Sequence, residues 1–148
     1  MLNNGLPDKL PQGWSTSTLG QVLPLTYGVG LPQKERDEAG SVPVYGSNGI
    51  VGFHSIAITA KPCLIIGRKG AAGAVHYSPV PCWPIDTTYY CEATPSTNLR
   101  FFYYLLQYLS LGTLDRSTAI PSLSRDDYNS ILVPVPPGNE QSRIVSKI

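Results

Sequence analysis

The chain has 148 residues, a formal net charge of +1, and 14 residues each of glycine and proline. This length fits one domain with a core of its own, and the glycine and proline content favours a turn-rich fold with β-strands over a helical bundle. No apolar run reaches the roughly 18 residues that span a bilayer, and residues 1–5 lack the pattern of a signal peptide. We therefore expect a cytoplasmic protein with no membrane partner.

The first two thirds of the chain read as short strands and turns. A short helix is expected over residues 17–22, ended by Pro24, and an exposed loop over residues 31–40. Strand-like runs then alternate with turns, and they cover residues 42–45, 50–53, 63–66, 74–77 and 87–91.

The last third predicts helices. Residues 99–111 carry apolar side chains at helical spacing, with Asn98 or Ser96 as the N-cap, and the width of the stripe indicates a helix that packs into the domain. A second helix is expected to begin at Ser124, and residues 132–137 to be extended before their prolines. Residues 140–148 open a helix too short to be stable alone, so we expect a fragment or a partner that completes it.

Cys63, Cys82 and Cys91 are odd in number, and they show no metal-binding spacing with each other or with the histidines. Their apolar neighbours indicate reduced thiols in the core. Charge is unevenly distributed: residues 41–125 hold six basic and three acidic side chains, and residues 61–85 hold no acid. This local excess is compatible with a polyanionic partner and equally with scattered, solvated charges.

Two glycine-rich turns at strand ends carry the most informative side chains. Ser47 and Asn48 lie in the first turn, within Val-Tyr-Gly-Ser-Asn-Gly-Ile-Val-Gly, and Arg68 and Lys69 lie in the second, within Gly-Arg-Lys-Gly-Ala-Ala-Gly. Arginine and lysine suit phosphates and guanine edges, whereas asparagine suits adenine edges. Both turns are therefore candidates for contacts with nucleic acid, the alternative being a hairpin turn that is basic without consequence.

The second turn also allows an enzymatic interpretation, which the spacing disfavours. A phosphate-binding loop ends in Gly-Lys-Ser/Thr, but Lys69 is followed by Gly-Ala, and no Gly-x-Gly-x-x-Gly precedes a helix. A small hydrolase or nucleotide-dependent enzyme would have to combine residues 67–73 with Asp86 and His76, yet no nucleophile motif accompanies them. Asp86 is expected to be a turn or cap residue.

The same segments, taken in order, resemble a target recognition domain of the DNA specificity subunit of type I restriction–modification systems. The resemblance rests on Leu-Pro-Gln-Gly-Trp at residues 10–14, the two glycine-rich turns, Trp-Pro-Ile-Asp-Thr-Thr at 83–88, and Val-Pro-Val-Pro-Pro at 133–137 with Glu-Gln following at 140–141. It covers nearly the whole chain from residue 10. A protein-interaction module is the third class that stays open.

The resemblance implies a single small α/β (α+β) domain with a strongly twisted, partly barrel-like mixed sheet. Residues 1–137 would form the DNA recognition domain, and residues 138–148 the beginning of a spacer helix. The chain would be a non-catalytic module that reads one half of a bipartite target in double-stranded DNA and directs modification and restriction subunits to it. S-adenosylmethionine and ATP would belong to those partners, with no cofactor in this chain. The residues expected to contact DNA are Ser47, Asn48, Arg68, Lys69, Arg116, Ser117 and Arg125.

Overall fold

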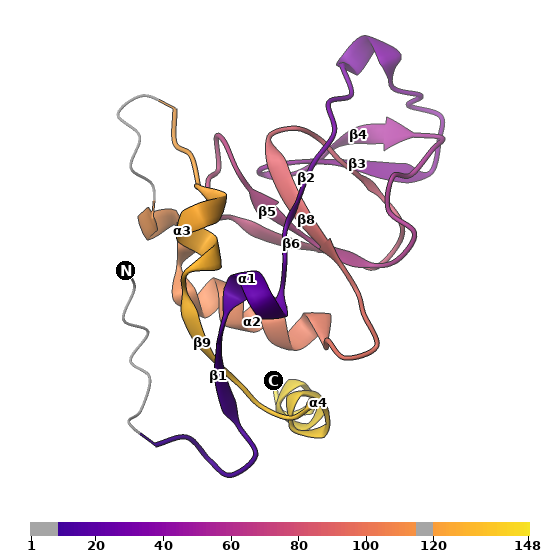
Figure 1. Cartoon of the computed structure of the whole chain (residues 1–148). Coiled ribbons are helices and arrows are strands. Elements are labelled where there is room, and N and C mark those ends of the chain that lie inside the picture. The colour runs from indigo at the N-terminus through magenta and orange to yellow at the C-terminus, as the bar shows by residue number, and fades with distance from the viewer. Residues whose placement is uncertain (1–8, 115–119) are drawn as a thin grey trace.

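The computed structural model describes residues 9–114 and 120–148, which form a mixed α/β domain (Figure 1). In chain order its elements are β1 (Ser15–Thr18), α1 (Leu19–Val22), β2 (Thr26–Tyr27), a 3-10 turn (Gln33–Glu35), β3 (Val42–Gly46), β4 (Gly49–His54), β5 (Cys63–Gly67), β6 (Val75–Ser78), β7 (Trp83–Pro84), β8 (Thr88–Glu92), α2 (Leu99–Leu109), a second 3-10 turn (Leu111–Leu114), α3 (Arg125–Asn129), β9 (Leu132–Val135) and α4 (Gly138–Ser146). The expected α/β class is confirmed.

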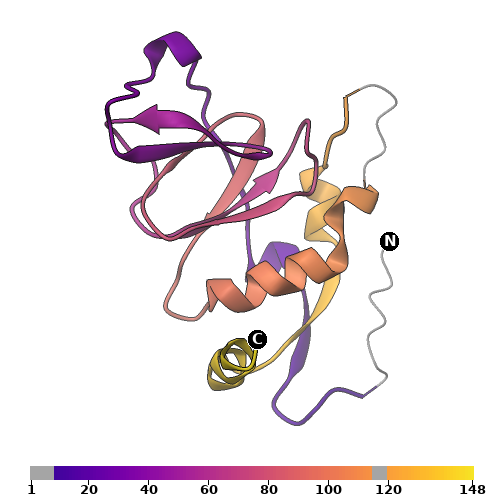
Figure 2. The ribbon, with the colours of Figure 1, turned by 180° about the vertical axis from the view of Figure 1, so that it is seen from behind.

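The described strands form three sheets. The first has four strands in the order β2-β8-β5-β6, the second has the order β4-β3-β7, and β1 pairs with β9 in the third. Every pair is antiparallel except β3 with β7, which is parallel, so the mixed pairing expected from the sequence occurs in the sheet β4-β3-β7, and the other two sheets are antiparallel. In Figures 1 and 2, β3 and β4 lie against one side of the four-stranded sheet, and α2 runs along the other side.

Strand β5 separates two apolar clusters, because alternate side chains of a strand point to opposite faces. Leu64 and Ile66 belong to the large cluster, which α1, α2, α3 and β9 complete. Cys63 and Ile65 belong to the small cluster, whose other members are Tyr45 of β3 and Cys82. The domain is therefore layered, with helices on one face of the central sheet and the β3–β4 hairpin on the other.

Local sequence explains the helix ends. The Asn98 side chain accepts a hydrogen bond from the Phe101 N–H, and Ser124 accepts one from the Asp127 N–H, so both expected N-caps are confirmed. Helix α2 ends at Leu109, two residues before the expected end, because Ser110 adopts the left-handed conformation with φ 53°.

The expected helix over residues 17–22 is wrong in its first two residues. Ser17 and Thr18 lie in β1, opposite Val133 and Leu132 of β9, and only Leu19–Val22 is helical. The strand forms because β9, almost 120 residues later, supplies the partner, and local propensity carries no sign of that pairing. The loop over residues 31–40 is mostly exposed as expected, although Leu31 is buried and Arg36 and Gly40 are half-buried.

All three cysteines are buried and free, as expected. Cys63 and Cys82 lie with their Sγ atoms 3.4 Å apart, and the hydrogen bond between the thiols, together with burial, raises the pKa of Cys63. Among the described residues, no helix is long and apolar enough to cross a membrane.

Candidate nucleic-acid interface

The loop that carries Arg68 and Lys69 is fixed by backbone hydrogen bonds on both sides. The N–H groups of Arg68 and Lys69 donate to the Thr87 carbonyl, with N···O distances of 2.8 and 3.1 Å. On the other side, the Leu123 N–H donates to the Arg68 carbonyl at 2.8 Å, and Lys69 forms a β-bridge with Ser122. The backbone of the loop is therefore held by its neighbours, which fixes the positions from which the side chains of Arg68 and Lys69 extend.

The two glycine-rich turns expected from the sequence are in contact. The Ser47 Oγ accepts a hydrogen bond from the Ala71 N–H, at 3.2 Å. Gly73, with φ +83°, allows the loop to close against the backbone of Leu111 and Gly112, where a side chain would collide. Asn48, beside Ser47, is exposed at the end of the β3–β4 hairpin.

An exposed tyrosine lies beneath two arginines. The centre of the Tyr27 ring is 4.4 Å from the Arg125 guanidinium carbon and 5.5 Å from that of Arg68. These are cation–π distances. Tyr27 is 47% exposed, and it is held by its antiparallel pairing with Tyr89, whose ring centre is 5.2 Å away. Burial raises the pKa of Tyr89, whose hydroxyl donates to the Leu123 carbonyl at 2.8 Å.

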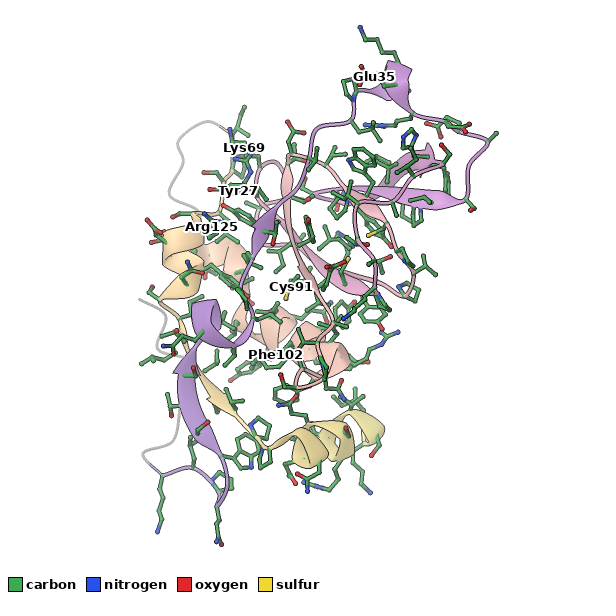
Figure 3. All side chains as sticks on the ribbon, turned by 45° about the vertical axis from the view of Figure 1, so that its right-hand side comes forward. Tyr27, Glu35, Lys69, Cys91, Phe102 and Arg125 are labelled. Carbon is green, nitrogen blue, oxygen red and sulfur yellow. The ribbon has the colours of Figure 1, made fainter. Side chains whose placement is uncertain are left out.

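These side chains line one hollow of about 480 Å³, which we call the basic hollow. Its lining consists of Tyr27, Arg68, Lys69, Tyr89, Ser122, Leu123, Ser124, Arg125 and Asp126. Three of these residues are cations and one is an acid. Figure 3 shows Tyr27, Lys69 and Arg125 close together on one side of the molecule, far from Glu35 at its tip.

The structure thus brings together three of the residues expected from the sequence, Arg68, Lys69 and Arg125, although Arg125 is 56 positions from Lys69. Ser47 is turned toward the loop and Asn48 toward solvent. Arg116 and Ser117 lie outside the described residues. Sequence reasoning missed Tyr27, which occupies a two-residue strand. The only signal in the sequence is an aromatic residue between Pro24 and Gly28.

The enzymatic alternative gains nothing from the geometry. Residues 68–74 connect the antiparallel strands β5 and β6, and the element that follows them is a strand, not the helix that a phosphate-binding loop requires. Asp86 lies in an exposed turn, as expected, where its backbone carbonyl accepts from Arg68. His76 lines a different hollow, with Tyr45 and Arg100. Within residues 9–114 and 120–148, no three histidine, cysteine or acidic residues are grouped to hold a metal ion.

Solved structures with the same fold come from type I restriction–modification systems. An S subunit from M. genitalium has a TM-score of 0.77 and 20% identity over 94% of this chain and 39% of its own. A structure that describes complex assembly and conformational transition of the type I R-M system has a TM-score of 0.75 and 20% identity, over 98% and 40%. The HsdS subunit from Thermoanaerobacter tengcongensis has a TM-score of 0.72 and 21% identity, over 94% and 37%.

The chain therefore spans about two fifths of the length of these structures, and at this identity they establish the fold alone. No curated protein matches it. The family is given by a separate match, because the model described as the type I restriction modification DNA specificity domain covers residues 11–148, nearly the whole chain. The chain belongs to the family of type I restriction modification DNA specificity domains.

Proposed function

We propose that this chain reads one half of a bipartite target in double-stranded DNA and directs the modification and restriction subunits of a type I system to it. The observation that carries the proposal is the basic hollow, which gathers Arg68, Lys69 and Arg125 from distant parts of the chain onto one surface. Contacts from such cations fix the position of a protein on DNA, and side chains on adjacent turns read base edges. The exposed Asn48 is suited to that reading.

Proteins of this family confer specificity and are not the catalytic subunits, so the enzymatic alternative is not favoured. We assign S-adenosylmethionine and ATP to the partner subunits, and we keep the cytoplasmic location and the division at residue 137 as predictions. Purified alone, the chain should neither methylate nor cut DNA, nor hydrolyse ATP. Turnover that follows the chain through purification contradicts this assignment.

The test is binding of the 148-residue chain to mixed-sequence duplex DNA over a series of salt concentrations. The logarithm of the affinity should fall linearly with the logarithm of the salt concentration, with a dissociation constant near the non-specific range of about 10⁻⁴ to 10⁻⁶ M. We expect weak binding because a single half-site reader, tested alone, gains no effective concentration from a linked second domain. Nanomolar binding to one sequence by this chain alone contradicts the half-site proposal.

The residue-level test combines Arg68→Ala with Lys69→Ala. The double variant should bind DNA more weakly, by about 1–3 kcal/mol if one of the two side chains reads a base edge, and it should show a flatter salt dependence. The matched control combines Lys9→Ala with Lys147→Ala, which removes the same charge near β1 and at the end of α4, at the opposite end of the molecule in Figure 1. Equal affinities of the two doubles would remove the assignment of Arg68 and Lys69 to DNA.

A further inference from the structure

We propose that the basic hollow binds one backbone phosphate of DNA, and that Tyr27 is the positioning residue that holds Arg68 and Arg125 toward it. The inference rests on the proposed function and assigns roles within it: the hollow supplies sequence-independent affinity, and the Asn48 turn is left to read bases.

The two arginines are restrained before any ligand arrives. The Arg68 Nε donates to the Asp86 carbonyl at 3.0 Å, and its Nη2 donates to the same oxygen. The Arg125 Nη1 donates to the Leu25 carbonyl at 3.4 Å. Each guanidinium is thus held between a neutral carbonyl and the Tyr27 ring, which reduces the side-chain entropy lost on binding.

The restraints leave donors for an anion. A guanidinium group has five N–H donors, of which these carbonyls take two from Arg68 and one from Arg125, and the Tyr27 ring takes none. Lys69 adds an ammonium group to the lining, against one carboxylate from Asp126. The hollow therefore keeps an excess of positive charge and unused donors of the kind that bind phosphate oxygens.

The shape of the site favours phosphate over a base edge. Phosphates are the outward groups of a duplex, whereas base edges lie at the floor of grooves and must be reached by a protruding element. Arg68 and Arg125 lie half-buried in a hollow, held down on a tyrosine, while Asn48 stands exposed on a hairpin end. The concave, cationic part suits the phosphate and the convex, polar part suits the groove.

The experiment measures affinity of the 148-residue chain for two duplexes of unrelated sequence, over a salt series, for the wild type and for Tyr27→Phe, Tyr27→Leu and Arg125→Ala. Tyr27→Phe keeps the ring and should bind like the wild type, whereas Tyr27→Leu should bind both duplexes about fivefold more weakly. Arg125→Ala should lower the salt slope by about 0.9. Adding Tyr27→Leu to Arg125→Ala should cost less than Tyr27→Leu alone, because the ring then positions one cation fewer.

Circular dichroism establishes whether each variant is folded. If Tyr27→Leu does not fold, the affinities of Tyr27→Phe and Arg125→Ala decide the outcome. The positioning role of Tyr27 is overturned if Tyr27→Leu binds DNA with wild-type affinity, or if Tyr27→Phe loses as much affinity as Tyr27→Leu. A loss confined to one duplex, or an unchanged salt slope in Arg125→Ala, overturns the phosphate assignment. These results leave the proposed function standing, which fails separately if the wild-type chain shows no salt-dependent binding to either duplex.

Discussion

The two faces of β5 are packed very differently. On one face, the large cluster gathers seventeen described residues from strands and three helices, and on the other the small cluster has four. Beyond the small cluster, β4 leaves Ile50, Val51 and Phe53 between 39% and 53% exposed. The helical side holds most of the buried apolar area, and hence most of the hydrophobic stabilisation of the fold.

The hairpin side depends more on polar contacts. The loop before β3 covers the edge of β4: the Phe53 N–H donates to the Glu38 carboxylate at 3.1 Å, and the backbone N–H of Asp37 donates to the His54 Nδ1 at 3.0 Å. The Ser47 hydroxyl joins the hairpin end to the loop of the basic hollow. The candidate binding turn therefore lies on the layer with fewer buried apolar contacts, so substitutions in that turn should lower the free energy of unfolding only a little.

The sharpest test of this comparison uses two adjacent residues of β5. Ile66 faces the large cluster and Ile65 the small one, and both are fully buried. Replacement of isoleucine by alanine costs about 2–5 kcal/mol, depending on how far the surroundings collapse into the cavity. We expect about 4 kcal/mol for Ile66→Ala and about 2 kcal/mol for Ile65→Ala, measured as the free energy of unfolding in urea.

The pair is its own control, since the same atoms are removed from the same strand at the same burial, and the change in strand propensity is shared. Equal losses would mean that the two layers are equally consolidated, and a larger loss at Ile65 would reverse the comparison.

The second test concerns pH and the thiol of the large cluster. Burial, with a smaller contribution from Glu92, raises the pKa of Cys91 from 9.0 to about 11. The fold favours the neutral thiol, so the free energy of unfolding should fall as pH rises from about 9 to about 11, by about 2 kcal/mol from this group. Cys91→Ala should lose less stability over that range in urea titrations, and a curve as steep as that of the wild type contradicts the assignment.

Much of this organisation could be predicted from the sequence, because it is local. The five strand-like runs between residues 42 and 91 all occur, with ends displaced by at most one residue, and Asn98 and Ser124 cap their helices as expected. The cations of the second turn were identified by their residue type and glycine context, without knowledge of their surroundings.

What could not be predicted depends on distant pairings. Arg125 lies near Arg68 because Lys69 forms a β-bridge with Ser122. Tyr27 lies beside both arginines because β2 pairs with β8. Neither pairing produces a periodic pattern in the sequence. Ser17 was expected in a helix for the same reason, since its strand exists through β9 alone. The sequence therefore identifies the cations of the basic hollow one by one, but it does not predict that they lie together in the folded chain.

A smaller effect is expected where the two turns meet. Ser47→Ala removes the hydrogen bond to the Ala71 N–H and should cost about 0.5–1.5 kcal/mol of unfolding free energy. NMR should show faster hydrogen exchange of the Ala71 amide in this variant, while the amides of α2 remain protected from exchange. Unchanged exchange at Ala71 would show that this bond does not connect the layers.

The smallest effect on stability belongs to Asn48, the neighbour of Ser47 in the same turn. Its side chain is exposed, and surface substitutions of this kind change the unfolding free energy by less than about 0.5 kcal/mol. Asn48→Ala should therefore unfold like the wild type in urea. If Asn48 reads an adenine edge, the variant should nevertheless lose about 1–3 kcal/mol of binding free energy on duplexes that carry the recognised base, and nothing on others.

This pattern distinguishes Asn48 from Arg68 and Arg125, because replacing either arginine should weaken binding uniformly across DNA sequences. A stability loss above about 1 kcal/mol, with no change in sequence preference, would place Asn48 among the residues that hold the hairpin and would end the division of roles between the turn and the basic hollow.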